Sequence, residues 1–346
     1  MSLSLADLGW HPDDHVESLI HSHPGLRPAR VTRAERGAWL VHDGAGELLA
    51  RGHARPLDDV PVTGDWVLIS GDERSSCYVE ALLPRRTTLS RAEAGRRKAE
   101  QVLAANVDVV ALCAAAGAVN HRRLDRELTA VWESGATPLV VVTKADTIAD
   151  PDDEVARAAA HCLGVDVVAV SSVSGEGVAA LRARIAAATT LALIGPSGVG
   201  KSSLVNALAG HEVLATADTR SDGKGRHTTT SRHLVPLPGG GLLLDTPGMR
   251  EFAPWVGDEG LQGTFADIDE LASHCRFSDC GHDSEPGCAV VIAAASDEEV
   301  GKRLDSWRRL QREQAWLERR HDARLMAQER RRWAIMSKSA RSQIRP

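Results

Sequence analysis

The sequence has few aromatic residues and no long apolar run. Phe, Trp and Tyr make up 3% of its 346 residues, and eight of these twelve side chains are Trp. The first residues contain no basic stretch followed by an apolar core, which argues against a signal peptide. The longest apolar stretch, Val107–Val119, contains Asp108 and Gly117 and is too short to span a bilayer. These absences predict a cytoplasmic protein with no membrane partner.

Cysteine is also sparse, and half of it lies in one short segment. Six cysteines in a chain of this size do not indicate a disulfide framework. Cys275, Cys280, His282 and Cys288 instead form the pattern C-x(4)-C-x-H-x(5)-C. Three thiolates and an imidazole fill the tetrahedral shell of Zn²⁺ and leave no open position, so the pattern predicts one structural zinc site. The alternative is a group of buried free thiols.

The net charge of −6 conceals a strong asymmetry. Residues 302–346 carry 14 Lys or Arg against 5 Asp or Glu, a local charge of +9, whereas residues 1–301 carry 27 basic and 42 acidic side chains, a charge of −15. A second basic segment, Arg85–Lys98, has six basic residues and one acidic residue and is expected to be a linker or an exposed loop. Such blocks often contact nucleic acid and predict RNA binding. The alternative for each segment is a solvated charged surface.

Short runs typical of β-strands occupy the region from about Arg27 to Pro84. They are ARVTR, AWLVHD, ELLARGHA, DWVLIS and SCYVEALL, separated by Gly, Asp and Pro. Five short strands at this spacing predict a small antiparallel barrel or sandwich, and five is the strand number of an OB-fold. We therefore expect an N-terminal β-barrel of the OB type.

From Val107 onward, apolar runs alternate with helical stretches. The runs are VDVVALCAAA, ATPLVVVTKAD, VDVVAVSS, TLALIG and GLLLDTPG. Runs this continuous are typical of parallel strands covered by helices on both faces, and they predict an α/β domain. The expected helices are Asp125–Glu133, Glu154–Leu163, Gly177–Ala188 and Ser202–Ala209. Beyond about Asp267 the chain becomes rich in Cys and His and then helical, with an amphipathic helix expected over Leu304–Leu325.

A phosphate loop is predicted at Gly195–Ser202, where GPSGVGKS stands between an apolar strand and a helix. The glycines allow a tight turn whose backbone N–H groups point at phosphate oxygens, and the helix N-terminus adds its positive end. Lys201, counted among the catalytic residues, is expected to reach the β- and γ-phosphates, and the Ser202 hydroxyl is expected to bind Mg²⁺. The expected nucleotide contacts here are Gly195, Pro196, Ser197, Gly198, Val199, Gly200, Lys201, Ser202 and Ser203.

The tetrapeptide DTPG at Asp245–Gly248 follows directly on the apolar run GLLL. A carboxylate at the end of a parallel strand beside the phosphate loop is placed to hold Mg²⁺, and the Gly248 N–H can sense the γ-phosphate. Alone, the tetrapeptide is also a good turn sequence. Together with the phosphate loop it predicts Asp245 as a magnesium residue and Gly248 as a nucleotide contact.

Two further loops predict which base is bound. TKAD, Thr143–Asp146, ends an apolar strand, and its Asp146 can accept hydrogen bonds from guanine N1 and N2, which adenine cannot donate. GTPases usually have Asn at the first of these positions, so whether Thr143 contacts the base or the phosphate loop is open. The nucleotide contacts expected from TKAD and from the later loop SSVSGEG are Thr143, Lys144, Ala145, Asp146, Ser171 and Ser172.

The order of these motifs is unusual. In an ordinary small GTPase the phosphate loop comes first and the base-reading loops last, whereas here TKAD and SSVSGEG precede GPSGVGKS and DTPG. Circular permutation is tolerated because spatial position, not chain order, determines the contacts of loops at the ends of strands. The sequence therefore predicts a circularly permuted GTPase in which the segment after DTPG runs straight into the Cys/His-rich region.

The permuted motifs, the N-terminal barrel and the C-terminal Cys/His cluster together resemble the RsgA/YjeQ family of ribosome small-subunit-dependent GTPases. The likeness extends from about Arg27 to Cys288. Further matching stretches are VTGDWV, LPRRTTLSR, QVLAANVD and GRHTTT. The resemblance implies an OB-fold, a permuted G domain and a zinc domain that act in late maturation of the small ribosomal subunit.

The stretch GRHTTT lies between the phosphate loop and DTPG, where a GTPase switch loop belongs. A Thr hydroxyl there can complete the Mg²⁺ shell when the γ-phosphate is present, and we expect Thr229 to do so, with Thr228 as the alternative. Met249 stands where many GTPases carry the Gln that orients the attacking water. The family resemblance implies that His227 takes this role, against the alternative of a solvent-exposed loop histidine.

We expect three domains and one GTPase activity. The domains are an OB-fold barrel with an N-terminal extension and a basic linker over 1–98, a circularly permuted α/β P-loop GTPase domain over 99–256, and an α-rich zinc domain with a basic C-terminal helix over 257–346. The chain is expected to be a monomer that binds the small ribosomal subunit and its rRNA, converts GTP to GDP and phosphate there, and leaves. The alternatives are a P-loop ATPase or kinase, and an RNA-binding zinc protein whose G domain senses nucleotide with negligible turnover.

Overall fold

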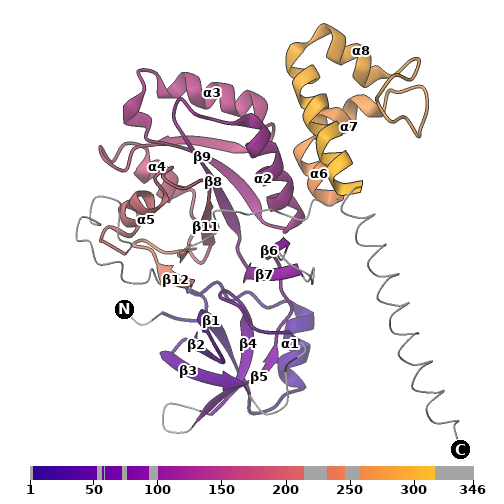
Figure 1. Cartoon of the computed structure of the whole chain (residues 1–346). Coiled ribbons are helices and arrows are strands. Elements are labelled where there is room, and N and C mark those ends of the chain that lie inside the picture. The colour runs from indigo at the N-terminus through magenta and orange to yellow at the C-terminus, as the bar shows by residue number, and fades with distance from the viewer. Residues whose placement is uncertain are drawn as a thin grey trace, which may run out of the picture. The chain divides into compact units, whose positions relative to one another are not determined.

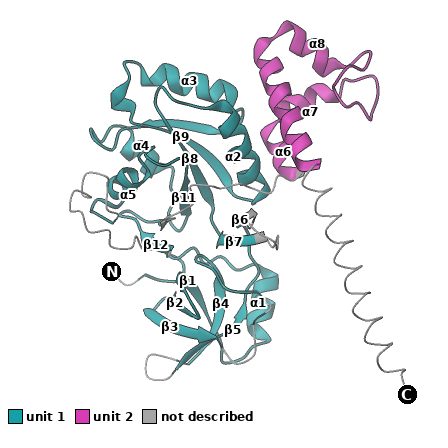
Figure 2. Ribbon diagram, in the orientation of Figure 1, with its two compact units in different colours: residues 1–255 teal, residues 256–346 magenta. Residues whose placement is uncertain are grey.

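The computed structural model describes residues 3–52, 57, 59–71, 76–92, 100–213, 232–245 and 258–315. The chain divides into two compact units, residues 1–255 and 256–346 (Figure 2). The first unit contains a β-barrel followed by an α/β layer, and the second is helical (Figure 1). None of the helices among the described residues is long and apolar enough to cross a membrane.

Five strands form the predicted barrel. They are β1 (Arg27–Glu35), β2 (Ala38–His42), β3 (Glu47–Gly52), β4 (Trp66–Ser70) and β5 (Cys77–Leu82). Their order is β1-β2-β3-β5-β4, and pairing of β1 with β4 closes the cylinder. The expected antiparallel arrangement is wrong for one pair, because β3 and β5 run parallel. Alternate side chains point inward, so Ala29 and Val31 on β1 pack with Val67 and Ile69 on β4 in a fully buried core. A short helix, α1 (Asp14–His21), precedes the barrel.

A five-stranded parallel sheet follows the barrel, as the sequence predicts. Its strands are β8 (Val109–Ala115), β9 (Thr137–Thr143), β10 (Asp166–Val170), β11 (Thr190–Ile194) and β13 (Leu242–Asp245), in the order β10-β9-β8-β11-β13. The helical elements are α2 (His121–Glu133), the 3-10 turn η1 (Ala145–Thr147), α3 (Pro151–His161), α4 (Val178–Ala183) and α5 (Lys201–Ala209). Consecutive residues of a strand, such as Val110 and Ala111 of β8, are both fully buried, and each belongs to a different hydrophobic core. Burial on both faces explains why these strands are continuous apolar runs.

The predicted linker is wrong over part of its length. Thr88–Ala92 forms strand β6, which pairs antiparallel with β7 (Glu100–Ala105). Leu89 is fully buried and lies opposite Ala104. Apolar packing on one face of this hairpin therefore outweighs the basic composition that suggested an exposed loop.

The sequence does not predict strand β12 (His233–Pro236) either. This strand pairs antiparallel with β13, and its first residue also lies opposite Arg33 of β1. Four residues are too few for a periodic pattern to indicate a strand. Because β12 pairs on both sides, the barrel and the parallel strands belong to one continuous 11-stranded sheet.

Buried polar contacts around Arg30 join the barrel to the α/β layer. This side chain is fully buried. It donates hydrogen bonds to the carbonyl oxygens of Leu8, Gly64 (3.2 Å) and Asn106 (2.8 Å) and to the hydroxyl of Thr190 (3.0 Å). The acceptors come from four separate stretches of the chain. This one side chain therefore connects the N-terminal segment, the barrel, the end of β7 and the start of β11.

The turn before β4 lies directly against the backbone of β7. Gly64 has a φ of +95°, and a Cβ there would overlap the carbonyl oxygen of Ala105, so the turn requires glycine. The buried carboxylate of Asp65 accepts two hydrogen bonds of 2.8 Å from Arg85 and one of 2.7 Å from the Val62 N–H. Burial raises the pKa of Asp65, and the ion pair with Arg85 opposes that shift. Arg85, expected on an exposed segment, is therefore largely buried against the barrel.

The second unit is helical around a small apolar core. Its helices are α6 (Asp258–Thr264), α7 (Ala266–Ala272), α8 (Ala289–Ser296) and a last helix whose described part covers residues 298–315. Phe265, Ile268 and Leu310 are fully buried in this core. The helix expected over Leu304–Leu325 is confirmed as far as residue 315, and its remainder lies outside the described residues.

The variant Arg85→Ala is expected to destabilise the barrel because it leaves the Asp65 carboxylate buried without its cation. Breaking a buried ion pair costs about 3 kcal/mol of unfolding free energy. The matched control is Arg86→Ala, because the ion pair of Arg86 with Asp108 has side chains that are 47% and 28% exposed. A pair this exposed contributes about 1 kcal/mol or less. Urea unfolding followed by circular dichroism measures both losses, and equal losses would contradict the assignment.

Candidate functional site

The predicted nucleotide loops converge at one edge of the sheet. Strands β9, β10, β11 and β13 run parallel, so their carboxyl ends, Thr143, Val170, Ile194 and Asp245, lie along this edge. The phosphate loop follows Ile194, TKAD begins at Thr143, and SSVSGEG follows Val170. Ligands of open α/β sheets bind at this kind of edge, beyond the carboxyl ends of the strands.

The phosphate loop has a backbone that side chains would disturb. All three of its glycines have positive φ angles: +150° at Gly195, +77° at Gly198 and +105° at Gly200. A Cβ on Gly195 would lie 2.6 Å from the carbonyl oxygen of Cys113, so the chain can leave β11 along this path only without a side chain. Helix α5 begins at Lys201 and directs its N-terminal N–H groups at the loop, an arrangement that binds anions.

Lys201, the first residue of α5, folds its side chain back over the start of this loop. Its Nζ donates hydrogen bonds to the carbonyl oxygens of Gly195 (2.6 Å) and Pro196 (2.7 Å). Val199 is 3% exposed and anchors the loop in the apolar core, whereas Pro196, Ser197 and Gly198 are exposed. The loop therefore offers an ammonium group and backbone N–H groups at one place, which suits a polyphosphate.

Thr143 contacts the phosphate loop. Its hydroxyl oxygen is 2.5 Å from the carbonyl oxygen of Val199 and 3.1 Å from that of Ala114, and the residue is 2% exposed. A hydroxyl carries one proton, so it donates principally to the nearer oxygen, which belongs to the loop. The Thr that replaces the usual Asn therefore ties strand β9 to the phosphate loop. Asp146 is exposed at the same edge of the sheet.

Ser171 uses its side chain to build the loop after β10. The residue is fully buried, and its hydroxyl accepts hydrogen bonds from the N–H groups of Val173 (3.2 Å) and Ser174 (3.1 Å). Its carbonyl oxygen accepts a third, from Gly175 (2.9 Å). The loop is thus closed on itself in the manner of a Ser turn, and Ser172 follows half-buried at the sheet edge.

Several predicted site residues lie outside the described part of the chain. These are His227, Thr228, Thr229, Gly248 and Met249. For Asp245 the backbone is described, at the end of β13, but the side chain is not. The roles expected for these residues in binding Mg²⁺, sensing the γ-phosphate and orienting water stay predictions.

An Arg–Glu pair beneath the phosphate loop is absent from the sequence predictions. Arg123 on α2 donates a 2.7 Å hydrogen bond to the carbonyl oxygen of Cys113, the oxygen that Gly195 approaches, and its Nε lies 3.1 Å from the Glu127 carboxylate. Glu127 is 7% exposed, and burial raises its pKa, with Arg123 and Lys201 opposing. The i, i+4 spacing of Arg and Glu is the available sequence signal, but exposed helix faces share it.

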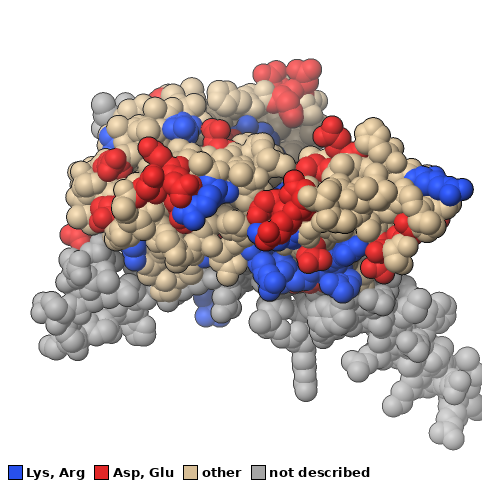
Figure 3. All heavy atoms as spheres, turned by 90° about the horizontal axis from the view of Figure 1, so that it is seen from above, with Lys and Arg blue, Asp and Glu red and all other residues tan. Residues whose placement is uncertain are grey.

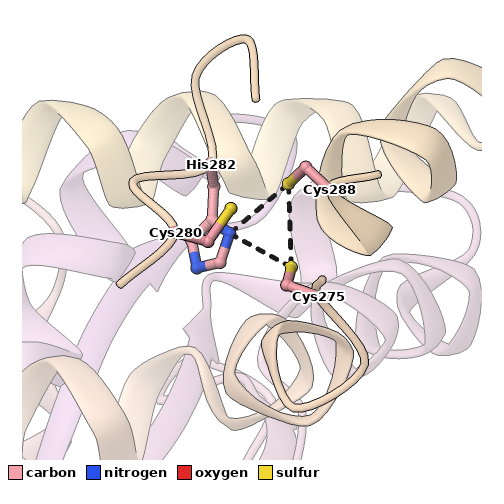
Figure 4. Close-up of side chains that lie close together, drawn as sticks. All are labelled: Cys275, Cys280, His282 and Cys288. Atoms are coloured by element: carbon pink, nitrogen blue, oxygen red, sulfur yellow. Dashed lines mark hydrogen bonds between the residues drawn. The ribbon is translucent and has the colours of Figure 1, made fainter. Parts of the chain in front are cut away.

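In the second unit, Cys275, Cys280, His282 and Cys288 converge (Figure 4), and their ligand atoms all lie within 4.8 Å of one another. The Nδ1 atom of His282 is 3.6 Å from Cys275 Sγ and 3.5 Å from Cys288 Sγ. Those two sulfur atoms are 3.8 Å apart. Tetrahedral Zn²⁺ with its usual bond lengths requires S–S separations of about 3.8 Å and S–N separations of about 3.6 Å. The four donor types, and the spacing of these three donors, therefore fit one Zn²⁺.

Hydrogen bonds from one loop side chain and from the last helix hold the loop that carries these donors in shape. The Glu285 carboxylate accepts hydrogen bonds from three backbone N–H groups, those of Gly281 (2.9 Å), Asp283 (2.8 Å) and Ser284 (3.1 Å). These hydrogen bonds lower the pKa of Glu285 to about 2, and the bond from Asp283 has the largest effect. Arg308, on the last helix, donates a 3.0 Å hydrogen bond to the carbonyl oxygen of His282. The histidine is thus positioned by the helix that packs behind it.

Sequence comparison relates this chain to GTPases of one family. The model that describes the RsgA GTPase family matches residues 82–255. The small ribosomal subunit biogenesis GTPase RsgA of Streptomyces avermitilis is 43% identical over 342 residues, covering 95% of this chain and 90% of that protein. The small ribosomal subunit biogenesis GTPase RsgA 2 of Lactiplantibacillus plantarum is 43% identical over 313 residues, covering 90% and 86%.

Solved structures show the same fold. The crystal structure of YjeQ from Thermotoga maritima superposes with a TM-score of 0.64 at 24% identity, covering 84% of this chain and 99% of that chain. The structure of YloQ, described as a circularly permuted GTPase, has a TM-score of 0.63 at 26% identity and covers 85% and 97%. The first likeness concerns the fold alone, and the second agrees with the permuted order of the motifs.

The variant Thr143→Val removes the hydroxyl that bonds to the phosphate loop and keeps nearly the same volume. We expect guanine nucleotides to bind about 5- to 10-fold more weakly, because a buried hydrogen bond of about 1 kcal/mol is lost and the Val199 carbonyl is left without it. The matched control Thr143→Ser keeps the hydroxyl and is expected to bind normally. Titration with a fluorescent GDP analogue measures the affinity of each variant. If the two variants bound the nucleotide equally weakly, the effect would come from packing and not from the hydroxyl.

The purified chain is expected to retain one zinc ion, because four protein donors complete its shell and metal binding stabilises a unit with so small a core. Replacement of a donor in Cys288→Ser should release most of the metal. The control Cys77→Ser removes a buried thiol of the barrel and should retain the metal. Elemental analysis after gel filtration measures the zinc, and a Cys288→Ser chain with its full complement would refute the site.

Proposed function

This chain belongs to the RsgA family of GTPases, and from that membership we propose that it binds the small ribosomal subunit, assists its late maturation and hydrolyses GTP while docked before it leaves. The conversion of GTP to GDP and phosphate is the activity of the family. The relatives from Streptomyces avermitilis and Lactiplantibacillus plantarum both carry the name small ribosomal subunit biogenesis GTPase. Docking, stimulation of hydrolysis by the subunit and coupled release are the proposal.

The observation that carries the proposal is the meeting of the phosphate loop and the base-reading loop at one sheet edge. Lys201 and the N-terminus of α5 offer positive charge to the phosphates there. Asp146 lies at the same edge, exposed, where its carboxylate can accept hydrogen bonds from guanine. An adenine base has no donor at those positions, so Asp146 favours GTP over ATP.

We assign magnesium binding to Ser202, Asp245 and Thr229. Magnesium, when bound, neutralises charge that develops on the phosphate oxygens during hydrolysis. The backbone register supports this choice, because Asp245 ends the strand next to the one that leads into the phosphate loop. His227 is proposed to orient the attacking water, since Met249 has no group that could do so.

The Cys/His cluster is proposed to hold one structural Zn²⁺. Its four donors leave no coordination position for a substrate or water, so the metal would stabilise the fold of the second unit and not take part in hydrolysis. We also propose the division of the chain into domains at 1–98, 99–256 and 257–346, with a single chain as the acting species.

RNA contact is proposed for the basic C-terminal segment, residues 302–346, and for the part of Arg85–Lys98 that is not used within the protein. Arg85 and Arg86 form ion pairs with Asp65 and Asp108, which reduces the charge they offer outward. Among the described atoms in Figure 3, acidic and basic side chains are interspersed. Phosphate contacts made by the basic segments would make subunit binding strongly dependent on salt.

The chain is expected to hydrolyse GTP slowly alone and about 10-fold or more faster with small ribosomal subunits, because docking completes the catalytic arrangement. Large subunits should have little effect. Release of phosphate at fixed GTP concentration measures the rates, with Lys201→Ala as the inactive control. If small subunits gave no stimulation, or large subunits gave as much, the ribosomal assignment would be wrong.

Two variants and a nucleotide-competition experiment separate the remaining assignments. His227→Ala should lower the stimulated rate about 100-fold, because the attacking water loses the side chain that positions it, without weakening nucleotide binding. Unchanged turnover would remove only the role of His227. Equal displacement of bound GDP by ATP and by GTP would indicate an ATPase. Full function of Lys201→Ala would indicate a nucleotide-sensing clamp without turnover.

A further inference from the structure

Strand β1 is shared by the barrel and the sheet of the G domain. Its first part, Arg27–Arg30, pairs with β4 and closes the barrel. Three residues later, Arg33 lies opposite His233 at the start of β12. One strand, with a register shift between Val31 and Arg33, therefore carries backbone pairing to both domains.

This shared strand reaches the nucleotide edge of the sheet. His233 lies opposite Arg33 on one side and opposite Asp245 on the other. Asp245 ends β13 and is the proposed magnesium residue. Two strand spacings separate the barrel residue Arg33 from Asp245, a distance of about 10 Å.

A buried side-chain hydrogen bond reinforces the junction. The hydroxyl of Thr63, in the barrel turn before β4, donates to the carbonyl oxygen of Arg232 (3.2 Å) and accepts from the N–H of Ala34 (3.3 Å). Thr63 is 1% exposed. Arg232 is the residue at which the described chain resumes after 214–231, the stretch that includes the predicted switch sequence. The first described residue after that stretch is therefore hydrogen-bonded to the barrel.

We propose that the barrel and the nucleotide site are energetically coupled through β1 and β12, so that the barrel responds to whether GDP or GTP is bound. GTPase switch segments change their arrangement with the γ-phosphate, and a displacement at Arg232 and His233 would pass to β1 through hydrogen bonds. Coupling is reciprocal, so a partner that binds the barrel favours one nucleotide state by the same factor. The inference rests on the proposed binding of GTP but not on the ribosome.

Amide hydrogen exchange of the full chain tests this coupling, with saturating GDP and with a saturating non-hydrolysable GTP analogue. We expect amides of residues 31–42, in β1 and β2, to exchange at rates that differ about 5-fold or more between the two states, the lower end of usual allosteric coupling. Thr63→Val should bring the difference below about 2-fold, because it removes the donor to Arg232. The control Thr32→Val, whose hydroxyl bonds inside the barrel to Leu40 (3.2 Å) and Glu47 (2.7 Å), should keep it.

A further variant, Thr63→Ser, keeps the hydroxyl and should keep the difference, which separates the hydrogen bond from packing. Equal exchange in the two states of the unaltered chain would overturn the coupling, whether or not a Thr63 variant folds. A folded Thr63→Val chain with the full difference would overturn the route through Thr63 and β12. Failure of the unaltered chain to retain either nucleotide would instead overturn the proposed function.

Discussion

The first unit depends on keeping the guanidinium of Arg30 charged and hydrogen-bonded in a place that water does not reach. Burial lowers the pKa of Arg30 to about 10, with Asp108 opposing, so the group is cationic at neutral pH. A buried charge is tolerated only where its donors are satisfied. Its acceptors belong to Leu8, Gly64, Asn106 and Thr190. The barrel therefore cannot shift against the parallel strands without removing hydrogen bonds from a buried cation.

The sequence predicts the elements whose formation depends on residues that are close together in the chain. The parallel strands are continuous apolar runs because both faces are buried, and the phosphate loop and the Cys/His cluster each carry their residues within one short segment. Strand β6 is not predicted because its basic composition suggests an exposed loop, although its partner β7 begins only a few residues later, and β12 is not predicted because four residues are too few to show a pattern. The same holds for Thr143 and Arg123, whose contacts with the phosphate loop and the strand beneath it appear only when three-dimensional neighbours are known. Nothing local in ARVTR indicates that its first arginine is buried.

Circular permutation changes what the nucleotide loops are attached to. In this chain the hairpin of β12 and β13 is paired to the barrel at its first strand and continues, after its second strand, toward the second unit that begins at residue 256. In chain order, this hairpin therefore lies between the predicted switch sequence and the second unit, whose basic C-terminal segment is proposed to contact RNA. A G domain in the ordinary order begins with its phosphate loop and ends with its base-reading loops, so its switch segments lie in the interior of the domain sequence.

Because of the close contact at Gly64, the sequences of homologues indicate how the barrel packs against the hairpin of β6 and β7. Any side chain at this position would occupy the volume of the Ala105 carbonyl oxygen. A homologue with a different residue there must hold its barrel farther from the hairpin or at another angle, whatever its overall identity to this chain. One column of an alignment therefore sorts relatives by how their first two domains are docked, before any of their structures has been determined.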